Sequence, residues 1–394
     1  MYYSEEPILM ECNDRVKKII EMHVELVNNI DGFCRIKAAW ETLSDAIGES
    51  GSVFGSYTWY ETWWQYYSAG ATLHLLTMWE ADKLVGIAPL MRRKTNLHGL
   101  PVNSIGFIEN RNSLHNDFIV IPAARELFLQ EVLRVLFEQS AQWDVLLLNN
   151  LPEISANHDP LVNILAETGR KWQKGPSFNS PYLMLSGSWT EYLASRTTRT
   201  RKSLRNIQNT IAKAGEVSVR NIRTWQEFQQ VRGNIYYVAK QSWTEKIGDS
   251  LATPVNEAFF DDLACRAAAK GCLSVWTLDL NGKMIAFEFH LKGCGKDHAM
   301  RGSYLPEFAS LSPGTYLELQ ILKNAFDEPE KVLKYDFGGS FDSYKRKWTD
   351  DAVPHCAIAI FNDNLYSRFA AFHETMTVPM LKIARNKFKR VKAE

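Results

Sequence analysis

Two stretches of the chain share one pattern of apolar and polar positions. Residues 73–90 and 273–290 align without a gap, and each consists of an apolar strand, a short polar turn and a second apolar strand. The turn is Ala81-Asp82 in the first stretch and Asn281-Gly282 in the second. Because Asn-Gly is a strong hairpin signal, both stretches predict a β-hairpin.

The elements around the two hairpins also occur in the same order. Each hairpin follows helical segments and precedes a strand, a helix and a buried strand. In the first half these segments are 57–67, 117–121, 124–140 and 143–148. In the second half they are 224–243, 255–270, 298–305, 313–326 and 332–337. Repetition on this scale indicates a duplicated unit.

The pattern predicts an α/β (α+β) chain with two tandem units, each a mixed, mostly antiparallel sheet flanked by helices. The boundaries we expect are a helical extension over 1–45, a first unit over 46–185, a second unit with the active site over 186–362, and a basic C-terminal helix over 363–394. Helical spacing covers residues 12–31 in the N-terminal extension, and 189–214 predicts a polar helix between the units.

Composition narrows the class of protein. Lys and Arg together number 45, as do Asp and Glu, so the net charge is +0 and no global field attracts nucleic acid. The six cysteines are scattered without a CxxC pair, which predicts neither a disulfide scaffold nor a zinc site. No signal peptide or run of about 18 apolar residues is visible, so we expect a cytoplasmic protein. The aromatic run over 57–67 predicts core or inter-unit packing.

Three motifs carry a resemblance to a known family. They are RTTRTRKSLRNIQNTIAKAGEVSVR (196–220), SLSPGTYLELQILKNAF (310–326) and YDFGGSFDSYKRKW (335–348). With the tandem units, they make residues 50–362 similar to Fem-type aminoacyltransferases and, more closely, to CelD-like (Fem-like) acetyltransferases of the GNAT superfamily, which are encoded near bacterial exopolysaccharide genes. The resemblance implies transfer of an acyl group from acetyl-CoA or another acyl-CoA to the nitrogen or oxygen of a sugar, amino-sugar or amino-acid-like acceptor. No metal is expected.

The donor site is expected at the start of a helix. GNAT enzymes hold the cofactor pyrophosphate on a glycine-rich turn at a helix N-terminus, where free N–H groups attract anions. The corresponding turn here, 310–315, keeps a single glycine. The expected cofactor-binding residues are Ser312, Gly314, Thr315, Gly338 and Gly339.

Four residues are candidates for the chemistry. Asp336 ends a buried strand before the Gly-Gly turn, and Tyr344 and Lys345 follow in the next loop. Glu288 is a carboxylate in an otherwise apolar strand, where an ionised group is costly unless it is paired or functional. The alternatives are that Asp336 caps the turn and that the Lys345–Lys347 run is a solvated surface.

Six residues are candidates for substrate binding: Asp117, Arg199, Trp243, His290, Arg301 and Tyr304. His290 shares a strand face with Glu288. Arg199 belongs to a stretch of five cations, Arg196 to Arg205, which predicts either a phosphate site or a solvated helix. For the others, packing or loop solvation is the alternative.

Two further functions fit the sequence. One is a Fem-like aminoacyltransferase that uses aminoacyl-tRNA, although no extended heptad pattern predicts the long helical arm that Fem enzymes often add for tRNA. The other is a non-catalytic accessory protein of polysaccharide assembly, since the fold alone does not define the function. The basic run 382–392 could bring the protein to the inner membrane face.

Overall fold

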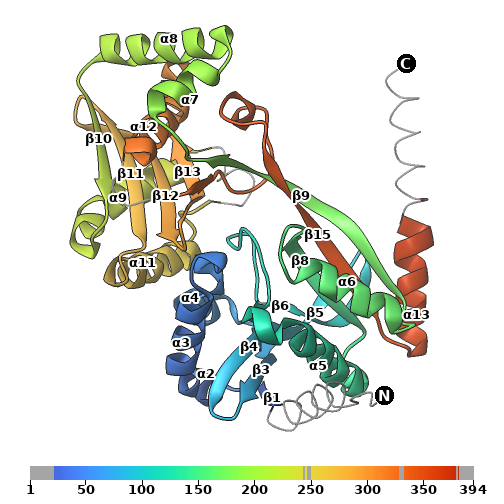
Figure 1. Cartoon of the computed structure of the whole chain (residues 1–394). Coiled ribbons are helices and arrows are strands. Elements are labelled where there is room, and N and C mark those ends of the chain that lie inside the picture. Colours follow the sequence, from blue (N-terminus) through green and yellow to red (C-terminus); the bar gives the residue numbers. More distant parts are fainter. Residues whose placement is uncertain (1–21, 243–244, 246–249, 328–331, 379, 381–394) are drawn as a thin grey trace, which may run out of the picture.

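The computed structural model describes residues 22–242, 245, 250–327, 332–378 and 380 (Figure 1). The first half contains β1 (Met22–Val27), α2 (Ile30–Arg35), α3 (Lys37–Ile47), α4 (Tyr57–Tyr67), β2 (Ala71–Leu73), β3 (Leu75–Glu80), β4 (Lys83–Ala88), β5 (Leu90–Leu97), β6 (Leu100–Phe107), β7 (Ile119–Val120), α5 (Arg125–Glu138), β8 (Val145–Pro152), α6 (His158–Glu167) and β9 (Trp172–Met184). The second half contains α7 (Trp189–Ser195), α8 (Thr198–Ala214), β10 (Val217–Ile222), α9 (Trp225–Gln241), α11 (Pro254–Ala269), β11 (Leu273–Leu280), β12 (Lys283–Gly293), β13 (Lys296–Tyr304), α12 (Pro313–Asp327), β14 (Lys334–Asp336), β15 (Ala352–Phe361) and α13 (Leu365–Phe372).

The predicted duplication is present. In the second unit the strand order is β10-β11-β12-β13-β14, with antiparallel pairs up to β13 and a parallel pair between β13 and β14. In the first unit β1, β3, β4 and β7 pair in the same order and also antiparallel. Both hairpins have their predicted turns, with positive φ at Ala81 and Asn281. The fold is therefore the expected α/β arrangement of two tandem units with helix-flanked sheets.

The two units exchange their last strands. β9 follows the first unit, and its end pairs antiparallel with β14 of the second unit. β15 follows the second unit and lies between β9 and β8, pairing antiparallel with both. One sheet of 11 strands therefore runs through both units, and Figure 1 shows β9 and β15 as the long strands that connect them.

The helix expected over 12–31 is wrong in the part that the structure describes. Met22–Val27 is a strand that pairs antiparallel with β3, from Met22 opposite Glu80 to Val27 opposite Leu75. The apolar residues Met22, Val24 and Leu26 alternate with polar ones, which suits a strand. The helices of this region begin only at Ile30, after Asn29 accepts a hydrogen bond from the backbone N–H of Gly32 at 2.8 Å.

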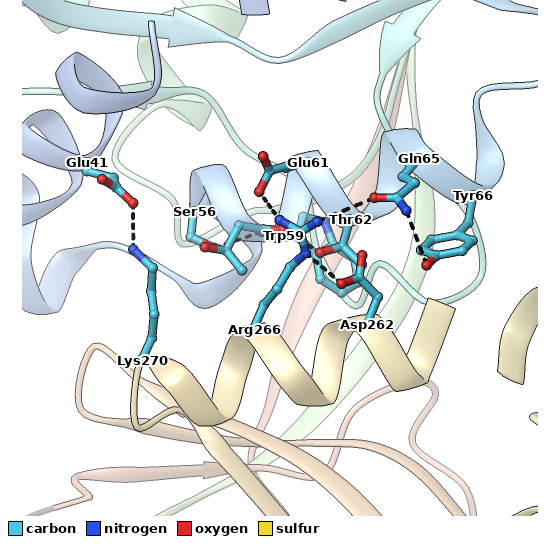
Figure 2. Close-up of polar contacts among 11 residues, drawn as sticks. Glu41, Ser56, Trp59, Glu61, Thr62, Gln65, Tyr66, Asp262, Arg266 and Lys270 are labelled. Carbon is cyan, nitrogen blue, oxygen red and sulfur yellow. Dashed lines mark hydrogen bonds and ion pairs between the residues drawn. The ribbon is translucent and has the colours of Figure 1, made fainter. Parts of the chain in front are cut away.

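The aromatic run forms α4, which packs between the units as predicted. Trp59 and Trp63 are almost fully buried, and the Trp59 ring lies 5.8 Å from that of Phe259 in α11. Figure 2 shows the polar border of this contact, where Arg266 of α11 reaches Glu61 of α4 and also binds Asp262 at 2.8 Å. Lys270 donates to Glu41 at 2.6 Å beside it. An apolar centre with a charged rim therefore joins the two units.

The polar segment 189–214 forms two helices, α7 and α8, rather than one. α8 is anchored on the second unit by Leu204 and Ile211, which are buried, while its cations face outward. Among the described residues, no helix combines the length and the apolar character needed to cross a bilayer. The predicted C-terminal helix begins at Leu365 as α13, and the basic run 382–392 lies outside the described residues.

Candidate active site

Strands β13 and β14 organise the candidate site. Their parallel pairing is short, with Lys296 opposite Lys334 and His298 opposite Asp336. Beyond this point β13 continues to Tyr304, whereas β14 ends and the chain turns at Gly338. Because successive side chains of a strand point to opposite faces, the polar residues here form two separate clusters, one on each face of the sheet.

On one face, the Asp336 carboxylate is buried and fully engaged. Its Oδ2 lies 3.1 Å from His298 Nδ1, and its Oδ1 accepts from Ser180 Oγ at 3.0 Å and from the backbone N–H of Gly338 at 2.9 Å. Burial alone would raise the pKa of Asp336, but the hydrogen bonds with His298 and with the backbone N–H of Gly338 lower it below its ordinary value. Asp336 is therefore an anion that these donors stabilise.

The same face opens on a pocket between the two units, which we call the inter-unit pocket. It has a volume of about 410 Å³ and is lined by residues of both units. His115, from the loop before β7, bonds Ser52 Oγ through Nε2 at 2.7 Å, and its ring centroid lies 5.5 Å from that of His298. Burial lowers the pKa of His115 well below its ordinary value, as does His298, so its imidazole is neutral.

Asp117 also lines the inter-unit pocket, on the side of the first unit. Its carboxylate accepts from Ser155 Oγ at 2.5 Å, Asn157 Nδ2 at 2.8 Å and the backbone N–H of Phe118 at 2.8 Å. Burial raises its pKa in spite of these donors. Asp117, a predicted substrate-binding residue, thus lines this pocket, while its hydrogen bonds tie it to the first unit.

On the other face, His290 is held between two carboxylates. Its Nδ1 lies 2.8 Å from Asp297 Oδ1, and its Nε2 lies 3.2 Å from Glu288 Oε2. Burial alone would lower the pKa of His290, but Asp297 and Glu288 raise it to about 10. His290 is therefore a buried cation at neutral pH, and it holds Glu288 in place.

Helix α12 adds a third carboxylate to this cluster, that of Glu318. Glu318 is buried, and burial together with the charge of Glu288 raises its pKa. Tyr335 of β14 lies beneath it, with a pKa raised by its own burial and by Glu318. Glu318 is thus the neutral partner of the pair, and Glu288, whose side chain is 14% exposed, is the more accessible carboxylate.

Lys345 holds the Gly338-Gly339 turn. Its Nζ donates to the carbonyl of Gly338 and, at 3.1 Å, to that of Ser340. It is 5% exposed, and burial lowers its pKa. Lys345 is thus not part of a solvated surface, whereas Tyr344 is 53% exposed with its ring 5.5 Å from Lys345 Nζ.

The predicted donor turn borders a second pocket, which we call the turn pocket. It has a volume of about 370 Å³ and lies between α8 and the residues Ser310–Ser312 at the start of α12. Arg199 and Lys202 of α8 line it opposite Ser312. Ser312 has a left-handed backbone (φ 54°), which is costly for a residue other than glycine and is often found at functional sites.

The other donor-turn residues lie next to this pocket. Thr315 Oγ1 accepts from Lys347 Nζ at 3.1 Å, which brings the end of the 345–347 run to the start of α12. Gly314 packs against Tyr304, whose Cδ1 would lie 3.6 Å from a β-carbon at that position. Ser312, Gly314, Thr315, Tyr304 and Arg199 therefore lie in one region, which brings predicted cofactor-binding and substrate-binding residues together.

Arg301 connects the units instead of lining either pocket. It donates to Asn112 Oδ1 from Nε at 3.0 Å and from Nη2 at 2.6 Å, and Asn112 in turn donates to the Tyr67 hydroxyl at 3.0 Å. The tyrosine donates to Asn256 at 2.6 Å. Trp243 lies outside the described residues.

The four predicted catalytic residues do not form one group. Asp336 faces the inter-unit pocket, Glu288 faces α12, and Lys345 is linked to Asp336 by hydrogen bonds through Gly338. The capping role considered for Asp336 is present, together with its contact to His298. Sequence reasoning did not single out His298, His355 or Ser52, because only the parallel register of β13 and β14 reveals that His298 lies opposite Asp336.

Comparison with known proteins agrees with the arrangement of the second unit. Residues 198–346 match the family model described as an acetyltransferase (GNAT) domain. This stretch contains the turn pocket, Glu288 and the Gly338-Gly339 turn. No curated protein matches the sequence.

Solved structures share the fold over nearly the whole chain. A conserved protein of unknown function from Bacteroides thetaiotaomicron is 12% identical, with a TM-score of 0.54 over 86% of this chain and 100% of its own. FemX is also 12% identical, with a TM-score of 0.54 over 88% and 100%. The C-terminal domain (DUF2156) of a putative lysylphosphatidylglycerol synthetase from Agrobacterium fabrum is 10% identical, with a TM-score of 0.51 over 86% and 95%. At identities of 10–12%, this similarity shows that the fold is shared.

Residues 198–346 are thus similar to GNAT acetyltransferase domains, which supports an acyltransferase as the class of protein. The finer resemblance to CelD-like proteins has no counterpart among these matches.

Proposed function

We propose that the protein transfers an acyl group from an acyl-CoA, with acetyl-CoA as the first donor to test, to the amine or hydroxyl of a sugar, amino-sugar or amino-acid-like acceptor. The observation that carries this proposal is the turn pocket, in which two cations of α8 face the start of α12 within the GNAT-type domain. The first N–H groups of a helix have no partner within the helix, and they favour anions.

Donor phosphates would lie in the turn pocket. Arg199 and Lys202 supply two positive charges, Ser312 supplies a hydroxyl, and the N-terminus of α12 supplies its dipole. This set replaces the missing glycines of the turn with side-chain cations. Lys347, which binds Thr315, adds a further positive charge beside the start of the helix.

The chemistry would take place at the second-unit strands beside α12. Glu288, held by protonated His290, is the base that takes the proton of the attacking amine or hydroxyl. The nucleophile forms a bond to the thioester carbonyl carbon, and the tetrahedral intermediate then releases the CoA thiolate. The thiolate receives the proton that Glu288 has taken, so the carboxylate is regenerated. Burial and the charge of Glu288 raise the pKa of Glu318, so Glu318 stays protonated beside the base.

Aminoacyl-tRNA is the alternative donor, and an accessory role without catalysis is the alternative function. The described helices are at most 17 residues long, as in α8 and α9, so the described part of the chain has no extended helical arm for tRNA. The structure offers a small pocket with a few cations, which suits a diphosphate better than a long polyanion. We further propose that the acyltransferase acts in the cytoplasm, in exopolysaccharide or cell-envelope synthesis.

Calorimetric titration with acetyl-CoA tests the donor site. The wild-type protein should bind at micromolar concentrations, and the Arg199→Ala/Lys202→Ala variant should bind at least tenfold more weakly, since each charge-assisted contact to phosphate contributes roughly 1.5–3 kcal/mol. Lys213→Ala/Lys240→Ala removes two exposed cations of the second unit outside the pocket and is the matched control. Equal binding by all three proteins would refute this donor site.

Release of free CoA thiol with a panel of amino-sugars and amino acids then tests the reaction. Glu288→Gln should keep the donor affinity and lose at least a hundredfold in transfer rate. An unchanged rate in this variant would exclude Glu288 as the base. Donor binding by wild-type protein without any transfer would favour the accessory role.

A further inference from the structure

A group of potential metal ligands lies where the two units meet, outside the proposed acyl-transfer site. One ring nitrogen each of His115 and His298 and a carboxylate oxygen of Asp336 all lie within 4.8 Å of one another. His115 comes from the first unit, and the other two come from paired positions of β13 and β14. All three line the inter-unit pocket.

The spacing of these groups suits a single small cation. Asp336 Oδ2 and His298 Nδ1 are 3.1 Å apart. Two ligands of one tetrahedral zinc ion are separated by roughly 3.3 Å, given zinc–ligand bonds of about 2.0–2.1 Å. A cation could therefore replace the proton that otherwise lies between the two atoms. His298 Nε2, which is buried without a hydrogen-bond partner among the described residues, would then carry the ring proton.

In two of the three ligands, His115 and Asp336, the remaining polar atoms are held as those of metal ligands usually are. Ligating histidines commonly bond a polar group through the second nitrogen, and ligating carboxylates are themselves hydrogen-bonded. His115 Nε2 bonds Ser52 Oγ at 2.7 Å, which leaves Nδ1 for a metal. Asp336 Oδ1 accepts from Ser180 and from Gly338, which leaves Oδ2. The orientation of both side chains is thus set before any ion binds.

The local charges leave room for a cation beside Asp336. Lys296 and Lys334 line the same pocket, but Lys296 donates to the carbonyl of Gly51 at 2.8 Å and Lys334 lies 4.0 Å from the centre of the Tyr182 ring. Among the described residues, neither lysine forms an ion pair with Asp336. Both lysines interact electrostatically with Asp336 without bonding to it, so the Oδ2 atom that bonds His298 is not taken by a lysine.

We propose that His115, His298 and Asp336 form a binding site for a divalent transition metal, with zinc as the best-fitting ion. Imidazole nitrogen and carboxylate oxygen are ligands that zinc accepts in tetrahedral sites. Three protein ligands leave the fourth position for a water molecule or a group in the inter-unit pocket. Because the ligands come from both units, the ion also joins the units. A search for cysteine pairs in the sequence could not reveal this metal site, because none of its three ligands is a cysteine.

The site is tested on full-length protein from which any purification tag and metal have been removed. Calorimetric titration with zinc chloride should give one ion per chain with a dissociation constant of micromolar or below. Cobalt chloride should give the intense visible absorption of tetrahedral cobalt. The melting temperature should rise with zinc, since an ion that binds only the folded state stabilises it by mass action.

Matched variants separate this site from surface histidines. His115→Ala/His298→Ala should lower zinc affinity at least a hundredfold and abolish both the cobalt spectrum and the thermal shift. His23→Gln/His98→Asn removes two histidines outside the pocket and should behave like the wild type. Asp336→Asn, which keeps a hydrogen-bond acceptor, should weaken zinc binding at least tenfold. Wild-type affinity no higher than that of the double alanine variant, with circular dichroism showing both folded, would overturn the proposal.

Discussion

Asp336 and Lys345 bind opposite ends of the same residue. Asp336 Oδ1 accepts from the N–H of Gly338 at 2.9 Å, and Lys345 Nζ donates to its carbonyl oxygen. Gly338 has a φ of +60°, and a β-carbon there would lie 2.4 Å from the carbonyl oxygen of Ala299 in β13. The anion and the cation thus hold a turn that only glycine can form, at the point where β13 and β14 separate.

Gly338→Ala should therefore destabilise the protein by roughly 2–4 kcal/mol, because the added methyl group meets backbone and the left-handed conformation is strained. Chemical denaturation measures this loss. Gly233→Ala is the control, since Gly233 lies inside α9 with open space around its Cα. That change should leave stability equal or raise it by up to about 1 kcal/mol. Similar effects of the two substitutions would contradict the close packing at Gly338.

His290 should stabilise the fold in a pH-dependent way. Its pKa is about 10 in the folded protein against an ordinary value of 6.5, so its contribution is complete below pH 6.5 and is lost as the pH rises toward 10. His290→Gln should cost roughly 3–5 kcal/mol near pH 6.5, because Asp297 and Glu288 lose their buried partner. The cost should shrink steadily toward pH 10. Urea denaturation at several pH values gives the profile, and a cost that does not change with pH would rule out a protonated His290.

Glu318 should also make the folded protein less stable as the pH rises, because its pKa is likewise raised on folding. Its pKa is raised above the ordinary value of 4.5, so the unfolded chain releases the proton first and the fold loses stability as the pH rises above 4.5. Glu318→Gln removes this loss. The free energy of unfolding of the variant should therefore exceed that of the wild type by roughly 1–3 kcal/mol at neutral pH. The exposed Glu307, paired with Lys283, is the control: Glu307→Gln should stay within about 0.5 kcal/mol at every pH. A stability advantage of Glu318→Gln over the wild type that does not grow as the pH rises would contradict a neutral Glu318.

The ion pair between Arg266 and Glu61 should couple the two units (Figure 2). Their side chains are 30% and 25% exposed, so the pair is partly shielded from water. A double-mutant cycle with Arg266→Met and Glu61→Gln should give a coupling free energy of about 1 kcal/mol, which falls as salt is added. The pair between Lys283 and Glu307, 50% and 60% exposed, should give under about 0.5 kcal/mol in the same cycle. A coupling free energy of zero at low salt in the Arg266–Glu61 cycle would show that this ion pair does not stabilise the contact between the units.

Local patterns predicted the duplicated units because each hairpin carries its signal within 18 residues. The strand at Met22–Val27 was missed because Val24 and Val27 fit helical spacing as well as alternation, and pairing with β3 decides between them. The exchange of β9 and β15 has no local signal, since it depends on contacts between residues far apart in sequence. The predicted cofactor residue Ser312 and the predicted substrate residue Arg199 line one pocket, although the sequence assigned them to separate sets. His298 could not be linked to Asp336 without the register of β13 and β14.

The exchanged strands have a consequence for how the chain folds during synthesis. β8 ends at Pro152, but the strand that covers its open edge, β15, begins at Ala352. At roughly 5–20 residues per second, the ribosome needs roughly 10–40 s to make the intervening segment. An uncovered strand edge can pair with other chains during that interval. The first unit therefore completes its sheet only after the second unit has been made, and its newly made strands depend on that delay being short or on a chaperone that covers the edge.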